Sequence, residues 1–403
     1  MKKIRLGTAV FYSRKRGKFS QLSLDGYVTT DNLLPNKAGV SAATNLPPKG
    51  ESFPRYYADD ILISNIRPYL KKIWFSNRTG TCSSDVLVLS ANKGFNPRFV
   101  YYSILRDEFF EHVMKGAKGT KMPRGDKDQI LEYPIPDFLP AIQDKIANLL
   151  SVIDSKIELN NKVNDNLEQM AKTLYDYWFV QFDFPNANGK PYKTSGGKMV
   201  WSEELKREVP DGWEVDAAEH IFQFNPSLSL GKGTRGSYID MNALPTYGYM
   251  TEEIQSKEFN GGMKFQNGDV VVARITPCLE NGKTALITLL SNDEIGFGST
   301  EFIVLRGRKR ALSAFAAFVS RSEEFRKFAI SNMTGTSGRK RVDAKTLANF
   351  KMTIPDMKVL SDFENIVAPF FQMLTKNTIE NKQLKNLRDW LLPILMNGQV
   401  KID

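Results

Sequence analysis

The chain contains two stretches with one pattern, Asp60-Ile-Leu-Ile-Ser-Asn-Ile-Arg-Pro-Tyr-Leu70 and Asp269-Val-Val-Val-Ala-Arg-Ile-Thr-Pro-Cys-Leu279. Each begins with an acidic residue, continues with the apolar and β-branched residues of a buried strand, and reaches a proline turn at the same position. The match predicts that one structural unit occurs twice in this chain.

Three further pairs of stretches match in the same order along the chain. They are Ser84-Asp-Val-Leu-Val-Leu89 with Thr300-Glu-Phe-Ile-Val-Leu305, residues 116–137 with 335–356, and Asn161-Lys162 with Asn381-Lys382. One match can arise by chance, but four in the same order indicate a duplication. The distance between partners drifts along the chain, so we expect insertions in the loops between shared elements.

Each copy closes with a long helical pattern, from Ile142 to Tyr177 in the first and from Phe363 to Leu395 in the second. Apolar residues of the first pattern alternate steps of three and four, at positions 142, 146, 149, 153, 163, 167, 170, 174 and 177. This spacing predicts a coiled-coil seam on a helix of about 40 residues, which is about 60 Å long.

A seam this narrow needs a partner, and the nearest candidate is the helix of the other copy. The alternative is that each helix covers the core of its own domain. Pro369 lacks an N–H, so it can lie only in the first turn of the second helix or at a kink. Polar residues interrupt both seams: Lys156 and Asn160 in the first, and Asn377, Asn381 and Arg388 in the second.

Short β-rich runs alternate with brief helical runs in the rest of each copy, which predicts a mixed α/β fold. Residues 184–209 are polar and rich in turn-forming residues, so we interpret them as a linker. The predicted order is a first domain at 1–140, a long helix at 141–183, the linker, a second domain at 210–357 and a second long helix at 358–403.

The composition favours an anionic partner. The 403 residues are 41% hydrophobic, which is enough to form two or three cores. The formal net charge is +10. Nucleic acid is the first candidate, because phosphates supply the electrostatic part of its binding to proteins.

Disulfide, metal and membrane classes find no support in the sequence. Cys82 and Cys278 are too few for a disulfide framework, and His112 and His220 have no ligand-like neighbours. No apolar run approaches the roughly 18 residues that span a bilayer, and the first residues show no apolar export segment. We therefore expect a cytoplasmic protein without a bound metal.

No catalytic motif is intact. Residues 277–284 end in Gly-Lys-Thr like a phosphate-binding loop, but Pro277 replaces the first glycine of that motif. Asp137 with Asp154 and Lys156 imitates the spaced acids and lysine of a nuclease, yet Asp154 and Lys156 fall within the helical pattern. An Asn/Asp-Pro-Pro-Tyr/Phe element and a glycine-rich loop for S-adenosylmethionine, which an adenine methyltransferase needs, are also missing. We expect a chain that is not an enzyme by itself.

Basic loops in both copies are candidates for binding DNA, because Lys and Arg neutralise phosphates and small residues let backbone N–H groups approach them. The loops near residues 13–18 and 230–238 are expected to occupy comparable places in their domains, and a solvated surface is the alternative. Arg235 or Arg339 could contact guanine. The candidate residues are Arg14, Lys15, Arg16, Lys18, Lys115, Lys118, Lys121 and Arg124 in the first copy, and Lys232, Arg235, Tyr238, Ser337, Arg339, Lys340 and Arg341 in the second.

Several stretches, taken together and in this order, are characteristic of one protein family. They are Ile135-Pro-Asp137 and Ile354-Pro-Asp356 with the loops before them, Gln143-Asp-Lys-Ile146, Leu174-Tyr-Asp-Tyr-Trp-Phe-Val-Gln-Phe-Asp-Phe-Pro185 and Val209-Pro-Asp-Gly-Trp213. On these stretches the chain as a whole resembles the specificity (S) subunit of type I restriction–modification systems. The second copy departs from the pattern, with Asp362-Phe-Glu-Asn-Ile366 where a Gln-x-x-Ile element is expected.

The resemblance implies that residues 1–140 and 210–357 are target-recognition domains, each reading one half of a split, asymmetric sequence in double-stranded DNA. It implies that the two helices form an antiparallel coiled coil that fixes the gap between the halves. Methyltransferase subunits, which bind S-adenosylmethionine, would dock on this scaffold, and a translocating restriction subunit could join them. A two-headed transcriptional regulator without enzymatic partners and an assembly scaffold that binds no DNA are the alternatives.

We predict that specificity is modular, because the two copies carry different loops. Replacing residues 1–140 by those of a related chain should change one half of the recognised sequence and leave the other half intact. Mapping of methylated sites checks this. The model of two separate readers is wrong if both halves change together.

Overall fold

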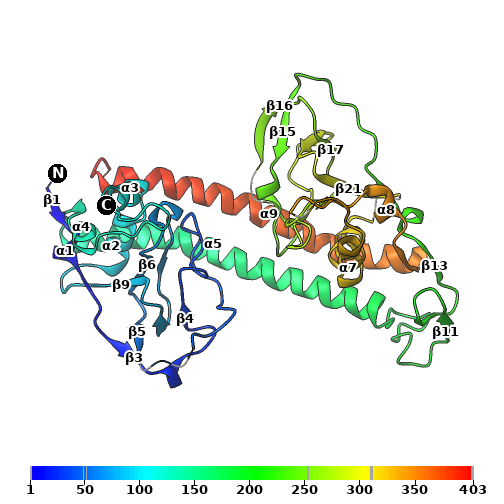
Figure 1. Cartoon of the computed structure of the whole chain (residues 1–403), viewed down its shortest axis with the longest axis horizontal. Helices are drawn as coiled ribbons and strands as arrows, with labels where there is room; N and C mark the ends of the chain where they lie inside the picture. Colours follow the sequence, from blue (N-terminus) through cyan, green and yellow to red (C-terminus); the bar gives the residue numbers. More distant parts are fainter. Residues whose placement is uncertain are drawn as a thin grey trace. The chain divides into compact units, whose positions relative to one another are not determined.

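The computed structural model describes residues 2–48, 50, 52–251, 254–308, 312–336 and 338–400. The chain divides into two compact units (Figure 1). Unit 1 consists of Met1–Ile157 and Leu384–Asp403, and unit 2 of Glu158–Gln383. Two long helices, α5 (Pro140–Tyr175) and α9 (Met357–Met396), contribute residues to both units.

Unit 1 contains two four-stranded sheets. The first is antiparallel, in the order β2 (Val10–Tyr12), β9 (Val86–Ala91), β6 (Ile61–Ser64), β7 (Ile73–Phe75). The second has the order β3 (Arg16–Gly17), β5 (Phe53–Tyr56), β8 (Gly80–Cys82), β4 (Tyr27–Val28), and β4 is parallel to β8. A separate pair joins β1 (Lys3–Arg5) to β10 (Pro134–Pro136).

Unit 2 repeats the first sheet strand for strand. Its order is β14 (Phe222–Phe224), β21 (Phe302–Gly307), β18 (Val270–Ala273), β19 (Thr284–Leu286), again antiparallel. The second sheet has the order β16 (Gln255–Glu258), β15 (Arg235–Ile239), β20 (Gly296–Gly298), β17 (Met263–Phe265). A separate pair joins β13 (Glu214–Ala217) to β22 (Lys351–Ile354).

Each unit also contains shorter helices. In unit 1 they are α1 (Leu6–Ala9), α2 (Pro97–Ile104), α3 (Asp107–Lys115), α4 (Lys127–Leu131) and the 3₁₀ turns Phe19–Gln21 and Pro68–Leu70. In unit 2 they are α6 (Ser313–Arg321), α7 (Glu323–Ser331), α8 (Ala344–Ala348) and the 3₁₀ turns Ala218–His220 and Met241–Ala243. Among the shorter helices, α2, α3 and α4 of unit 1 correspond to α6, α7 and α8 of unit 2.

The two matched stretches that open the sequence form β6 and β18, which are central strands of the first sheets. Both strands are buried along their whole length because each side of the sheet is covered. Ile61 and Ile63 pack in the core with the helices, whereas Leu62 packs in the core with the second sheet. Val270 and Val272 face the helical core in unit 2, and Val271 faces the other. The second sheet is therefore the outer layer of each unit.

The second sheets correspond only in part. In both, a central strand (β8 or β20) has one parallel neighbour (β4 or β15) and one antiparallel neighbour (β5 or β17). The fourth strand differs, because β3 pairs with β5 whereas β16 pairs with β15. Our expectation that residues 13–18 and 230–238 occupy comparable places is therefore wrong. The counterpart of β15 is β4, and β3 has no counterpart among the described strands of unit 2.

The segment between the two copies is more ordered than a linker of turns. Residues 184–209 contain β11 (Met199–Ser202) and most of β12 (Arg207–Pro210), which pair antiparallel. A π-helical turn, Asp176–Val180, precedes the segment. Phe184 stacks on Trp213, with ring centroids 4.8 Å apart, so aromatic contacts tie this segment to unit 2.

The long helices pack against each other in antiparallel orientation, as the resemblance implied. In unit 2, Asn160 Nδ2 donates to Asn381 Oδ1 at 3.0 Å, and Asn377 Nδ2 donates to Asn164 Oδ1 at 2.8 Å. In unit 1, Arg388 Nη1 lies 2.9 Å from Asp154 Oδ1. Residue numbers increase along α5 while those of their partners decrease along α9, so the two helices run in opposite directions.

The predicted seam of α5 mixes two faces of the helix. Positions 146 and 153 are buried, as are Leu150, Ile157 and Asn160. Positions 142, 149, 163 and 170 are instead exposed. Apolar residues form two neighbouring stripes on α5, and both stripes have spacings of three and four residues. The spacing alone therefore did not show which stripe packs in the core and which is exposed to solvent. Pro369 lies inside α9 and not in its first turn.

A buried acceptor from each long helix holds the start of a short helix. In unit 1, Gln143 Oε1 accepts from Asn96 N at 2.9 Å, immediately before α2. In unit 2, Glu364 accepts from Phe315 N at 2.8 Å and from Ala314 N at 3.3 Å, in the first turn of α6. Glu364, and not the aligned Asp362, therefore takes the place of Gln143 in the second copy.

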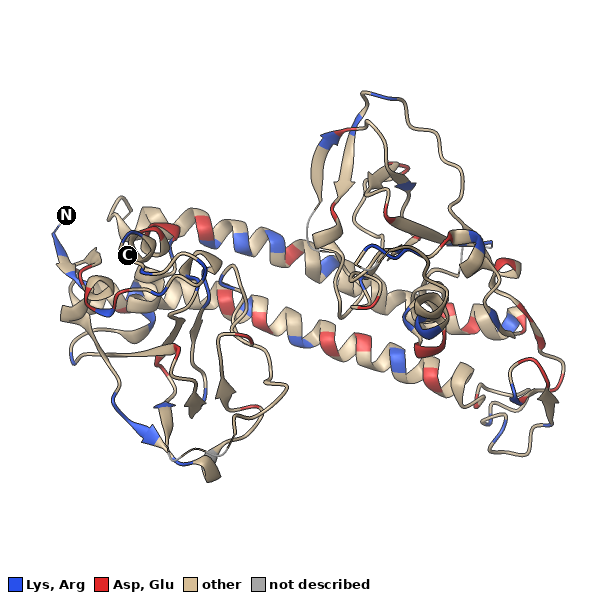
Figure 2. Cartoon of the chain, in the orientation of Figure 1, with Lys and Arg blue, Asp and Glu red and all other residues tan. Residues whose placement is uncertain are grey.

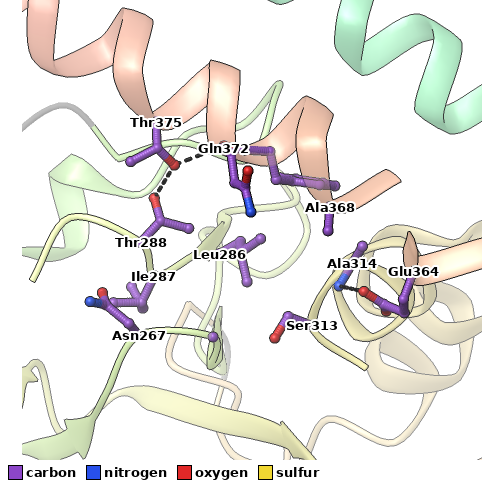
Figure 3. Close-up of a pocket in the computed structure, with 12 residues that line it drawn as sticks. Asn267, Leu286, Ile287, Thr288, Ser313, Ala314, Glu364, Ala368, Gln372 and Thr375 are labelled. Atoms are coloured by element: carbon purple, nitrogen blue, oxygen red, sulfur yellow. Dashed lines mark hydrogen bonds between the residues drawn. The ribbon is translucent and has the colours of Figure 1, made fainter. Parts of the chain in front are cut away.

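Glu364 lies at a cavity of about 370 Å³ that α9 forms with the segments around Gly268 and Ser313 (Figure 3). Its side chain is almost fully buried. Burial disfavours the charged carboxylate and raises the pKa of Glu364 to about 7, against the opposing effect of the two backbone N–H donors.

We predict that Glu364 makes unit 2 less stable as the pH rises. The pKa is raised on folding, so its contribution is complete below the ordinary value of 4.5 and is lost as the pH passes 7. The loss is on the order of 3 kcal/mol at most. Glu364→Gln keeps an acceptor without the charge, so its thermal midpoint should rise relative to the unchanged chain between pH 5 and 8.

The control for this experiment is Asp362→Asn, which removes a charge from an exposed position of the same helix. Its thermal midpoint should follow that of the unchanged chain at every pH. The prediction is contradicted if the thermal midpoint of the Glu364→Gln variant depends on pH in the same way as that of the unchanged chain.

Candidate nucleic-acid interface

Each unit has a basic hairpin loop that is anchored by an equivalent ion pair. In unit 1, Lys118 and Arg124 face each other across the loop, and Arg124 Nη1 lies 3.1 Å from Asp85 Oδ1. In unit 2, Thr334 and Arg341 face each other, and Arg341 Nη2 lies 2.7 Å from Glu301 Oε1. Asp85 and Glu301 belong to matched stretches, so the two anchors occupy the same place.

The anchors change how these candidate residues can act. Hydrogen bonds from Arg341 hold the pKa of Glu301 below its ordinary value, so the pair is charged at neutral pH. Arg124 and Arg341 each keep a partner within their own unit, and Lys118 Nζ lies 3.2 Å from Asp126 Oδ2. We therefore infer that these three residues shape the loops.

Other candidates of the hairpins are exposed at their surface. They are Lys115, Lys121, Arg339 and Lys340. Ser337 lies outside the described residues. Small residues at the tips adopt backbone angles that favour glycine, with φ of 96° at Gly119 and 125° at Gly335. This arrangement suits contacts with phosphates.

The candidates near the N-terminus lie on the outer sheet of unit 1. Arg16, on β3, donates from Nε to Ser52 Oγ at 3.1 Å and from Nη2 to Ser52 O at 2.9 Å. Lys15 Nζ lies 4.6 Å from the centre of the Tyr57 ring. Arg55 also lies over that ring, at 5.2 Å. Arg14 and Lys18 are exposed in the same segment.

The corresponding sheet of unit 2 carries its own basic group. Arg235 Nε donates to Ser256 Oγ at 3.1 Å, between β15 and β16. Lys257 Nζ lies 3.9 Å from the centre of the Tyr238 ring, which also packs against Phe297. Lys232 is exposed just before β15. Figure 2 shows Lys and Arg at the outer end of this strand pair.

Sequence reasoning missed two kinds of residue in these groups. Arg55, Lys257 and Lys264 each lie over an aromatic ring. Arg55 and Lys264 are close in the sequence to their rings, Tyr57 and Phe259, but only folding brings Lys257 on β16 over Tyr238 on β15. The whole of β16 is exposed and reads Gln-Ser-Lys-Glu, so no alternation of apolar residues marked it as a strand.

Within the described ranges, no group of three His, Cys, Asp or Glu side chains is placed to hold a metal ion. No helix in the described part of the chain is long and apolar enough to cross a membrane. Lys283, of the sequence that imitates a phosphate loop, donates to Met241 O at 2.9 Å.

Both long helices also carry large apolar side chains on their open faces. A surface of this kind is a candidate binding site for another protein, because soluble proteins rarely expose regular apolar stripes to water. In unit 1 these residues are Ile142, Leu149 and Val152 of α5 with Leu387 and Trp390 of α9; in unit 2 they are Leu159, Val163 and Met170 of α5 with Ile366, Met373 and Ile379 of α9.

Comparisons with known proteins agree with this architecture. No protein-family model matches the chain. The specificity subunit of the type I restriction enzyme HindI from Haemophilus influenzae is 22% identical over 93% of this chain and 94% of the relative. The EcoAI specificity subunit from Escherichia coli is 32% identical over 49% of this chain and 34% of the relative.

Among solved structures, the S subunit of the type I restriction–modification system from M. genitalium has the same fold. The alignment covers 100% of this chain and 96% of that chain, with a TM-score of 0.54 and 17% identity. At this identity the likeness concerns the fold alone.

We predict that exposed hairpin residues contact phosphates. Lys121→Ala and Arg339→Ala should each weaken DNA binding and lower the slope of log affinity against log salt by about one unit. Lys162→Ala removes the same charge from an exposed position of α5 and should leave the slope unchanged. Binding titrations at several salt concentrations measure the slopes. Equal slopes for all three variants and the unchanged chain would exclude the hairpins from the interface.

Proposed function

We propose that this chain, which belongs to the specificity subunits of type I restriction enzymes, reads a split sequence in double-stranded DNA with one half-site for each unit. It is a non-catalytic subunit that recognises the DNA target within a larger complex. The duplicated sheets with different outer strands carry the proposal, because one scaffold with two different surfaces suits two different half-sites.

The basic residues of the outer sheets and hairpins support binding to DNA. Lys15, Arg16 and Arg55 gather on one outer sheet, and Arg235 and Lys257 on the other. Aromatic rings beneath Lys15 and Lys257 hold the charged groups in place. These positioned charges and the exposed residues of the hairpins can bind the phosphates of the DNA backbone. Other side chains of the units are then available to contact the bases.

The open apolar stripes of α5 and α9 support the docking of methyltransferase subunits, with a restriction subunit joining the assembly. A sequence reader that modifies nothing has to hold a modifying enzyme, and S-adenosylmethionine would be bound by that enzyme. A transcriptional regulator without enzymatic partners leaves these stripes unexplained. A complex that reads and methylates chromosomal DNA works where that DNA is, so we place the chain in the cytoplasm.

We predict that a charge on the open stripe weakens docking. Met170→Glu puts a carboxylate where an apolar partner surface would bury it, and affinity for the methyltransferase subunit should fall by tenfold or more. Gln169→Glu adds the same charge to an exposed neighbour off the stripe and should bind as the unchanged chain does. Co-purification and DNA methylation by the assembled complex are the readouts.

Equal binding by the two variants would place the methyltransferase elsewhere on the chain. Full methylation activity in a complex from which this chain is omitted would instead overturn the proposed function.

A further inference from the structure

Groups that read bases must differ between the two units if the units read different half-sites, a condition that rests on the proposed function. Residues that are equivalent in both copies can bind features common to all DNA, above all phosphates, but cannot tell one half-site from the other. We therefore expect base-reading groups where the units differ, either on a strand that only one unit has or on a strand whose neighbour differs between the units.

The outer sheets meet this condition. Three strands correspond in the two units, whereas the fourth lies on opposite edges, as β3 beside β5 and as β16 beside β15. Each added strand creates a two-stranded pair with an open edge, and the major groove of DNA is wide enough to admit such a pair. Figure 1 shows β15 and β16 as a ribbon at the edge of unit 2.

The two different edges carry the same local arrangement. An exposed arginine on one strand donates its Nε to a serine hydroxyl beside or on the partner strand, at 3.1 Å in both units. The pairs are Arg16 with Ser52 and Arg235 with Ser256. The strands are not equivalent, so the duplication of the scaffold does not account for the recurrence.

A bond at Nε suits the recognition of a guanine. It fixes the plane of the guanidinium while leaving the fork of Nη1 and Nη2, and such a fork matches the O6 and N7 acceptors of guanine in the major groove. Among the described residues, the terminal nitrogens of Arg235 make no other hydrogen bond, and Arg16 uses one Nη2 hydrogen on Ser52 O. Both forks are therefore available.

The two anchoring arginines of the hairpins lack this availability. Arg341 donates from both Nε and Nη2 to Glu301, and Arg124 is paired with Asp85. Their places are also equivalent in the two copies. Both observations argue against base reading by Arg124 and Arg341 and favour the outer edges for that role.

We propose that Arg16 and Arg235 each read a guanine in the major groove of their own half-site, and that Ser52 and Ser256 are positioning residues that orient them. The two strand pairs β3–β5 and β15–β16 are then the elements that determine specificity.

The test uses the full chain assembled with its methyltransferase subunit. Arg235→Lys keeps the charge but loses the fork, so discrimination at one guanine of the unit 2 half-site should fall roughly 10- to 100-fold. The salt slope and the unit 1 half-site should stay unchanged. Arg16→Lys should give the mirror result. Mapping of methylated sites and competition binding measure the discrimination.

Two further measurements separate orientation from folding. Ser256→Ala should reduce discrimination at the same guanine, and Ser256→Thr should restore it, because threonine keeps the hydroxyl. Replacing that guanine by 7-deazaguanine, which lacks the N7 acceptor, should weaken binding by the unchanged chain but not by Arg235→Lys. Lys232→Ala, the control beside β15, should lower the salt slope without changing discrimination.

The inference is overturned if the unit 2 half-site contains no guanine, or if Arg235→Lys discriminates as well as the unchanged chain. It is also overturned if 7-deazaguanine weakens binding of both proteins equally. Failure of the proposed function looks different, because the unchanged complex would then methylate no split sequence at all, and this inference would fall with it.

Discussion

The antiparallel pairing of α5 with α9 is the contact on which both units depend. Unit 1 completes its helical core with Leu150 of α5 and Leu392 of α9, and unit 2 with Ala171 and Phe363. The seam includes buried amides such as those of Asn160 and Asn381. A slip of one turn would leave these amides without partners, at about 1–3 kcal/mol for each group. The polar layer thus favours one register where apolar contacts alone would tolerate several.

The same helices also fix where the short helices begin. Gln143 and Glu364 are buried side chains of α5 and α9 that accept backbone N–H groups near the starts of α2 and α6. These bonds satisfy donors that a helix cannot satisfy internally. The first sheets pack on those helices through one face and on the outer sheets through the other. Within each unit, the pairing of the long helices therefore determines the position of the first sheet, and the first sheet determines the orientation of the outer sheet.

Sequence alone predicted the features that arise from local pattern. The matched stretches identified β6 and β18, and the spacing of apolar residues identified both long helices, because burial on both faces and helical periodicity leave direct traces in the residues. It did not predict which stripe of α5 meets α9, since Leu149 and Leu150 are equally apolar. Nor did it predict that Arg124 anchors a loop while Arg235 is held by Ser256. Those outcomes depend on partners brought together only by folding, as does the replacement of Gln143 by Glu364.

The division between shared and different parts arises from the physics of a sheet. A central strand such as β6 or β18 is packed on both faces, so a change in it disturbs two cores at once. At the edge of a sheet, another strand can be added through main-chain hydrogen bonds, so the identity of its side chains is less restricted. Strand β16 is exposed along its whole length. New side chains can therefore be presented at the outer edges without repacking either core, and this is where a duplicated scaffold can acquire two different surfaces while its long helices stay paired.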